Sequence, residues 1–290
     1  MTLLALDKKL RIATLNFLHN IEDLDNRARI LAEEVNRLEL DVLSLQEVPY
    51  LPYPFSPVLD KLEALTGLKT VATNQHDEFP NRDAGLAILS SLPKLDAASL
   101  YLDGDYASTV LRKISEDPLA ARLQTPSGQA IEVINAHLSW GGHRENARLK
   151  QLIRINQHAK RAAENAMSVY LAGDLNTLPS SMSTAYLRGE YVPESEEEGT
   201  YWIDSWDLLR SEEQGTTTSG RGYWSKQTAA RWGIHLPELI PDRRIDYIFT
   251  YGWTYGKLGT PLQTGQFANE LATEISDHKG VWVDILDGNV

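Results

Sequence analysis

The chain of 290 residues contains no cysteine. This absence excludes disulfide bonds, zinc–thiolate sites and cysteine nucleophiles. The sequence also has no run of apolar residues long enough to predict a membrane-spanning helix. Its first residues, MTLLALDKKLRIATLNFL, lack the basic start, apolar core and small-residue cleavage site of a secretory signal. We therefore expect a cytoplasmic, monomeric protein with no integral membrane association.

Positive charge is also scarce, since 28 lysines and arginines face 40 acidic residues, for a net charge of −12 at pH 7. A polyanion partner requires a positive surface, so this balance argues against a broad, sequence-independent coat on nucleic acid. A local basic groove remains compatible with it. Hydrophobic residues make up 42% of the chain, which is typical of a globular protein with an ordinary core.

Hydrophobic periodicity predicts strands and helices in mixed order along the chain. Strands are predicted at 11–17, 41–48, 85–90, 119–123, 130–138, 168–172, 244–250 and 280–285, and helices at 24–38, 57–65 and 144–163, with 177–200 as a loop. Hairpins alternate with strand–helix units, and no internal repeat or low-complexity linker interrupts them. The pattern is typical of a single α+β domain, residues 1–290, in which helices cover the outer faces of two packed sheets.

Several strongly apolar strands end in an acid, an amide or a histidine. These residues are Asn16, Glu47, His137, Asp174 with Asn176, and Asp246, and the cluster Ser276-Asp277-His278 precedes the last strand. Taken singly, each has an ordinary structural explanation, such as a turn, a salt bridge or a hydrogen-bonded core histidine. Together they indicate a shared site, because buried carboxylates at strand ends usually share a metal ion, another cation or a proton.

Six short motifs contain these residues in a fixed order: TLN (14–16), LQEV (45–48), NAHL (135–138), GDLN (173–176), RIDYIF (244–249) and SDH (276–278). In order and in strand-end context, they resemble the signature of the deoxyribonuclease-I-like endonuclease/exonuclease/phosphatase superfamily. The resemblance extends from residue 11 to residue 285. It implies a four-layer α/β sandwich of two packed mixed β-sheets flanked by helices.

The resemblance implies that Glu47 is the principal ligand of Mg²⁺, supported by Asn16 and Asp277. Magnesium suits such a set, because it is a hard ion that takes oxygen ligands and keeps several waters beside one or two carboxylates. Mn²⁺ is the alternative ion.

The same resemblance implies the catalytic roles. Asp174 orients or deprotonates the attacking water, and Asn176 donates to the charge that develops on the phosphorus oxygens. His137 and His278 bind the phosphate, while Asp246 orients His278. The expected reaction is metal-dependent hydrolysis of a phosphodiester by in-line attack of water, which needs positioning and positive charge rather than a covalent intermediate.

Two departures bear on the substrate. The exonuclease-III-like branch carries an acid two residues after the first Asn, where this chain has Leu18, and a tyrosine where it has His137. An abasic-site endonuclease is thereby disfavoured. Nucleic acid or a nucleotide is the first expectation for the substrate. A lipid or sugar phosphate, as in sphingomyelinase-like or inositol-phosphatase-like enzymes, and an inactive binding scaffold are the alternatives. The GNHD and GHxH motifs of calcineurin-like phosphoesterases are absent.

Two stretches mix aromatic residues with features suited to a cleft. Residues 220–233, GRGYWSKQTAARWG, combine three basic with three aromatic side chains, so they are expected either to stack a base and hold a backbone phosphate or to form a packed surface loop. Residues 49–55, PYLPYPF, directly follow the strand that ends near Glu47 and either line the cleft or form a proline-rich turn. The basic helix at 144–161 is expected to be mostly a solvated outer face.

Overall fold

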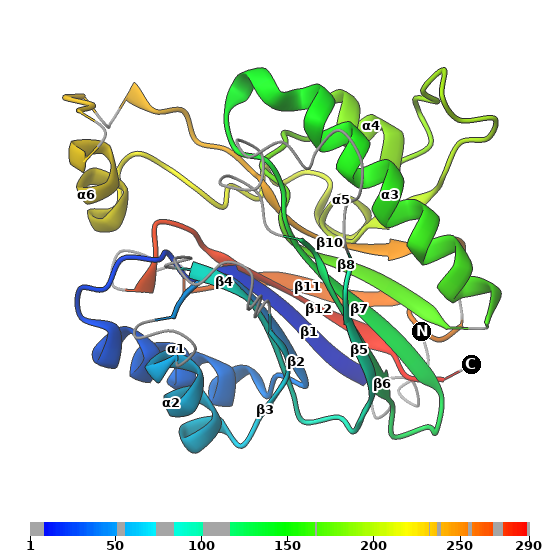
Figure 1. Cartoon of the computed structure of the whole chain (residues 1–290), viewed down its shortest axis with the longest axis horizontal. Helices are drawn as coiled ribbons and strands as arrows, with labels where there is room; N and C mark the ends of the chain where they lie inside the picture. The colour runs from blue at the N-terminus through cyan, green and yellow to red at the C-terminus, as the bar shows by residue number, and fades with distance from the viewer. Residues whose placement is uncertain are drawn as a thin grey trace.

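The computed structural model describes residues 9–50, 56–73, 84–100, 117–165, 167–231, 233–236, 239–254, 257–268 and 275–288. Two six-stranded sheets face each other, with helices on the outer surfaces (Figure 1). The strand orders are β11-β12-β1-β2-β4-β3 and β5-β6-β7-β8-β10-β9. The predicted fold of two packed mixed sheets flanked by helices is thus confirmed.

The first sheet contains β1 (Lys9–Asn16), β2 (Val42–Pro49), β3 (Lys69–Thr73), β4 (Ala84–Ser90), β11 (Pro261–Phe267) and β12 (Gly280–Leu286). The second contains β5 (Lys94–Ser99), β6 (Leu119–Gln124), β7 (Ala130–His137), β8 (Ser168–Asp174), β9 (Trp202–Asp204) and β10 (Asp246–Tyr251). The α-helices are α1 (Leu24–Leu38), α2 (Pro57–Thr66), α3 (Glu145–Glu164), α4 (Met182–Leu187), α5 (Ser205–Arg210) and α6 (Tyr223–Arg231).

Each sheet contains one parallel strand pair joined by a helix. β1 pairs with β2 in parallel through α1, and β7 pairs with β8 in parallel through α3, whereas the other pairings are antiparallel. The carboxyl ends of the parallel strands therefore lie at one end of their sheets. These ends carry the polar motifs, so the topology gathers segments that are distant in sequence.

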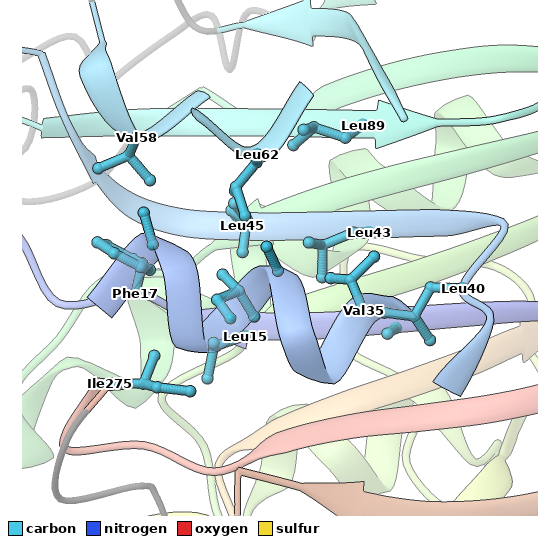
Figure 2. Close-up of a cluster of buried hydrophobic side chains, with 14 of the residues drawn as sticks. Leu15, Phe17, Val35, Leu40, Leu43, Leu45, Val58, Leu62, Leu89 and Ile275 are labelled. Atoms are coloured by element: carbon cyan, nitrogen blue, oxygen red, sulfur yellow. The ribbon is translucent and has the colours of Figure 1, made fainter. Parts of the chain in front are cut away.

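Three apolar clusters correspond to the three interfaces of the four layers. One packs α1 and α2 on the first sheet, with Leu15, Leu45 and Leu62 at its centre (Figure 2). A second fills the space between the sheets. The third packs α3 on the second sheet and includes Leu152. Alternating strand residues belong to different clusters, since successive side chains point to opposite faces of a sheet.

Some local predictions were wrong. The 177–200 segment, predicted as a loop, includes the short helix α4, whose Tyr186 and Leu187 are fully buried against the second sheet. The acidic residues 194–198 within it do form a largely exposed turn region. The 220–233 segment contains the helix α6 rather than a loop. Within the described residues, no helix is long and apolar enough to cross a membrane.

Candidate active site and metal site

The candidate site lies at the end of the apolar layer between the sheets. Ile12 in β1, Val133 in β7 and Ile248 in β10 all belong to the cluster that fills this layer. Asn16, His137 and Asp246 follow the same two-residue alternation on these strands and so face the same layer. The apolar pattern that builds the core thereby directs the polar strand ends toward one another.

Glu47 enters the site through an irregularity in β2. Leu45 and Val48 both pack in the cluster beneath α1, although they are three positions apart, and the β2–β4 register shifts between them. Glu47 has a positive φ of 53°, an uncommon conformation for a residue with a side chain. This β-bulge makes Glu47 an extra residue in the strand, so its carboxylate does not follow Leu45 into the cluster beneath α1.

The GDLN motif has a geometric requirement for its glycine. Gly173 has φ of 152°, and a Cβ placed on it would lie 1.9 Å from the carbonyl oxygen of Ala136 in the neighbouring strand. This close approach allows β8 to run beside β7 with Asp174 directly opposite His137. Asn176 also has a positive φ, of 51°, and its backbone N–H donates to Asp174 Oδ1 at 2.9 Å.

Four predicted residues meet within a few ångströms. Asn16 Nδ2 donates to Glu47 Oε1 at 3.0 Å and to Asp174 Oδ2 at 3.1 Å. His137 Nε2 lies 3.9 Å from Glu47 Oε1 and 3.7 Å from Asp174 Oδ2. The two carboxylates therefore share one amide and one imidazole, although Glu47 comes from the first sheet and Asp174 from the second.

Asp246 and His278 form a buried pair beside this group. The distance from His278 Nδ1 to Asp246 Oδ2 is 2.9 Å, and His278 Nε2 lies 3.9 Å from Asp174 Oδ2. Burial by itself would lower the pKa of His278, but the charge and hydrogen bond of Asp246, with the charge of Asp174, raise that pKa well above 6.5. The imidazolium is therefore the favoured form, and it suits an anionic ligand.

His19 is a site residue that the sequence reasoning missed. Its Nδ1 lies 2.5 Å from Glu47 Oε2, and its backbone N–H donates to the same oxygen at 3.3 Å. Burial would raise the pKa of Glu47, but the hydrogen bond with His19, the charge of His137 and the amide of Asn16 hold it well below its usual range. The sequence signal that could have identified His19 is its position three residues after Asn16, in the loop that follows β1.

Asp277 is half-buried next to these groups. Burial raises its pKa, with a further contribution from the negative charge of Glu47. Ser276 fixes this segment, because its hydroxyl donates to the carbonyl oxygen of Asn16 at 2.6 Å and accepts from the backbone N–H of His278 at 3.1 Å. The motif before β12 is thus tied directly to the end of β1.

Asn176 lies at the edge of the group and is only half-buried. Its Nδ2 donates to the carbonyl oxygen of Leu138 at 3.1 Å. The same amide group would supply a donor to an anionic ligand only through its second hydrogen or after a small rotation. The structure therefore places Asn176 near the site but engaged with the loop that follows His137.

The donor set fits a hard divalent cation. Glu47 Oε1 and Asp174 Oδ2 both accept from the Asn16 amide, and in addition to burial the negative charges of these two carboxylates raise the pKa of Asp277, so a bound cation would relieve their mutual repulsion. Ligand atoms of Asp174, Asp246 and His278 also lie within 4.8 Å of one another, a spacing that could hold a metal ion. In that second cluster Asp246 already engages Nδ1 of His278, leaving Nε2 as the atom that faces Asp174.

The helix α6 borders this group on the side of Asp277. Thr228 Oγ1 donates to Asp277 Oδ2 at 3.4 Å, and an ion pair of 3.5 Å joins Arg231 to Glu22 in the loop after β1. The aromatic and basic 220–233 segment is thus next to the site, although its Trp232 lies outside the described residues. The same holds for residues 51–55 of the 49–55 stretch, so its position relative to the cleft stays a prediction.

Comparison with protein families agrees with this geometry. Residues 13–278 match the model of the Endonuclease/Exonuclease/phosphatase family. The chain belongs to this family. The match spans nearly the whole chain and every predicted site residue. Endonuclease/exonuclease/phosphatase family members are metal-dependent hydrolytic phosphoesterases and nucleases.

Solved structures of the endonuclease/exonuclease/phosphatase family have the same fold. TDP2 of D. rerio, complexed with single strand DNA product, has a TM-score of 0.69 at 20% identity, covering 96% of this chain and 98% of that one. The human Nocturnin catalytic domain with bound sulfate anion has a TM-score of 0.64 at 18% identity, and the match covers 96% of this chain and 93% of that one. An endonuclease/exonuclease/phosphatase from Bacteroides vulgatus has a TM-score of 0.66 at 17% identity, and the match covers 96% of this chain and 98% of that one. Comparison with curated protein sequences finds no match.

Proposed function

We propose that the chain is a Mg²⁺-dependent phosphodiesterase that cleaves nucleic acid or a nucleotide by in-line attack of water. The observation that carries the proposal is the meeting of Glu47, Asp174 and His137 around the amide of Asn16. Two carboxylates from different sheets are held within reach of one imidazole, and such fixed positioning suits phosphoryl transfer, in which catalysis is mostly positioning and electrostatic stabilisation. The single-stranded DNA product bound by the structurally similar TDP2 supports a nucleic acid substrate.

Glu47 is the principal metal ligand in this proposal, with Asn16 and Asp277 in support. The low pKa of Glu47 keeps it ionised and ready to bind a cation at any physiological pH. Asn16 holds the Glu47 carboxylate in place by its hydrogen bond. A bound Mg²⁺, or Mn²⁺ in its place, supplies Lewis acidity to the phosphoryl oxygens and steadies the leaving oxygen.

Asp174 is the residue that orients or deprotonates the attacking water. Its Oδ1 accepts from the backbone N–H of Asn176 and its Oδ2 from Asn16, so the carboxylate is fixed in orientation. A carboxylate fixed in this way aligns water for in-line attack at small entropic cost.

The two histidines bind the phosphate. Asp246 orients and charges His278 through its contact with Nδ1, which turns Nε2 toward Asp174 and the reacting group. His137 approaches the same point from β7. Each preorganised donor of this kind contributes about 3 kcal/mol to transition-state stabilisation, and the Asn176 amide adds a donor from the GDLN turn.

A substrate panel tests the proposal. The purified chain is assayed with Mg²⁺ on single-stranded and duplex DNA, RNA, bis-p-nitrophenyl phosphate, sphingomyelin and inositol phosphates. Cleavage of the nucleic acids and of bis-p-nitrophenyl phosphate that is abolished by a chelator and restored by Mg²⁺ is the expected result. Activity confined to sphingomyelin or to inositol phosphates would contradict it.

Hydrolysis of a lipid phosphate is the second candidate. Exposed apolar side chains follow α6 at Ile234, Leu236 and Leu239, and Leu239 is 73% exposed. Such side chains suit contact with a lipid surface. Sedimentation with phospholipid vesicles separates the candidates, because a nucleic acid enzyme stays in the supernatant.

A further inference from the structure

Two buried arginines occupy matching places in the two halves of the sandwich. Arg27 is the fourth residue of α1, and Arg148 is the fourth residue of α3. Each lies eleven positions after the polar residue that ends the preceding strand, Asn16 in β1 and His137 in β7. Their exposed fractions are 0% and 4%, although arginine is rarely buried in proteins.

Arg27 binds backbone carbonyl oxygens of two segments, the loop after β1 and the segment before β12. Its guanidinium donates to Leu18 at 2.9 Å, to Asn20 at 2.6 Å and also to Phe17, all in the loop after β1. Its Nε donates to the carbonyl oxygen of Ile275 at 2.6 Å, directly before Ser276 and Asp277. One side chain thus joins the loop that carries His19 to the segment that carries Asp277.

Aromatic rings enclose the same guanidinium. The Phe17 ring centroid lies 4.5 Å and the Trp224 ring centroid 4.8 Å from the Arg27 carbon at the centre of the guanidinium. Trp224 belongs to α6, so Arg27 also anchors the helix whose Thr228 contacts Asp277. No carboxylate within the described residues forms a salt bridge with Arg27, and burial lowers its pKa to about 10. Its directed bonds are therefore to backbone carbonyls.

Arg148 makes equivalent bonds to the loop after β7, which follows the proposed phosphate-binding residue His137. Its Nη1 donates to the carbonyl oxygens of Ser139 at 2.9 Å and Gly141 at 2.8 Å, in the loop after β7. Glu145 holds the guanidinium from the same helix, with Nη2 3.0 Å from Oε2. The loop so fixed follows His137 and includes Leu138, whose carbonyl oxygen accepts from Asn176.

We propose that Arg27 and Arg148 are paired positioning residues, Arg27 for the metal ligands and Arg148 for the phosphate-binding groups. This assignment of sides rests on the proposed function. Both bind main-chain oxygens that a shorter or single-headed side chain cannot reach together, because the guanidinium offers five N–H donors in a fixed fork. Each arginine thus fixes one set of site groups relative to the packed helix that carries it.

The test compares Arg27→Lys and Arg148→Lys with two controls, Val35→Ala and Ile155→Ala. The controls remove buried packing farther along α1 and α3, away from the site loops. Metal affinity is measured by electron paramagnetic resonance with Mn²⁺, and phosphate affinity by calorimetry with inorganic phosphate. Steady-state kinetics on bis-p-nitrophenyl phosphate are recorded at varied metal and varied substrate, and far-UV circular dichroism confirms that each variant is folded.

Arg27→Lys is expected to weaken Mn²⁺ binding by about 10-fold or more, with KM at saturating metal unchanged. Arg148→Lys is expected to leave Mn²⁺ binding unchanged while phosphate affinity and kcat/KM fall by about 10-fold or more. The controls lower Tm only. Metal and phosphate affinities within error of the wild type, or losses equal to those of the controls, would overturn the proposal.

Milder variants keep the test valid if the lysine variants do not fold. Trp224→Leu removes one of the rings that enclose Arg27, and Glu145→Gln weakens the ion pair that holds Arg148. The same split between metal and phosphate affinity, at smaller size, is expected, and its absence would overturn the proposal. If the wild type cleaved no diester, the proposed function would fail, while the two binding measurements would still decide the role of the arginines.

Discussion

The side-chain amide of Asn16 donates to Asp174 Oδ2 at 3.1 Å, so a residue of the first sheet holds a carboxylate of the second. The two are 158 positions apart in sequence. Since the same Nδ2 also donates to Glu47, it fixes the distance between the proposed metal ligand and the proposed base. Relative motion of the sheets would separate these groups.

Asp174→Asn tests whether Asp174 acts as the base while Glu47 binds the metal. The variant retains the shape of the side chain but loses the base, so kcat is expected to fall by at least about 10²-fold. Affinity for Mg²⁺ or Mn²⁺ should be nearly unchanged, because Glu47 is the principal ligand. Kinetics at saturating metal and a Mn²⁺ titration measure the two effects. If metal affinity fell together with kcat, Asp174 would itself be a ligand.

Glu47→Gln removes the charge of the proposed ligand and retains its size. The metal concentration for half-maximal activity is expected to rise by about 10-fold or more, and turnover at low Mg²⁺ should be lost. Glu33→Gln is the control, since Glu33 is an exposed carboxylate of α1 whose ion pair is with Arg29. Unimpaired turnover of Glu47→Gln at low Mg²⁺ would exclude it as the principal ligand.

Gly173→Ala tests the close approach of β8 to β7. A methyl group at this position meets the Ala136 carbonyl oxygen, and φ of 152° is a conformation that essentially only glycine adopts. We expect the free energy of unfolding to fall by about 3 kcal/mol or more. Urea denaturation measures it. Gly142→Ala is the control, because a Cβ there meets no atom within 4 Å, and a stability of Gly173→Ala equal to that control would refute the argument.

Much of the fold followed from the alternation of apolar residues. The predicted strands at 11–17 and 168–172 and the helical stripe from Leu24 to Leu38 correspond to β1, β8 and α1. These elements are strongly periodic because each contacts a continuous apolar layer. β5 was missed because its sequence, KLDAAS, is mostly exposed at a sheet edge and carries little apolar signal.

The sequence pattern predicted which polar residues lie at the strand ends, but it did not predict the contacts between them. The strand-end position of Asn16, Glu47 and Asp174 could be inferred, since it depends on local pattern. The β-bulge at Glu47 could not, because it depends on register with β4. His19 was missed because its contact with Glu47 depends on how the loop after β1 folds back. Arg27 holds this loop through its backbone carbonyl oxygens, and no local sequence pattern connects Arg27 to His19.

Asp246 and His278 are expected to act as one unit. His278→Ala should be severe and Asp246→Asn milder, and the double variant should be scarcely worse than His278→Ala alone. The reason is that Asp246 contacts Nδ1 of His278 and, in the proposed function, acts by orienting and charging this imidazole. A double-mutant cycle on kcat/KM measures the coupling. Fully multiplicative losses would show that the two residues work independently.

The pH dependence of the same pair gives a second, independent readout. Asp246 raises the pKa of His278 above 6.5, so the contribution of the His278 imidazolium to stability is fully present below about pH 6.5 and is lost as pH rises through the raised pKa. Activity that requires the imidazolium should fall over that same upper range. In Asp246→Asn the pKa of His278 is lower, so the alkaline fall of kcat/KM should move to lower pH. An unshifted alkaline limb in Asp246→Asn would mean that His278 does not act as the cation.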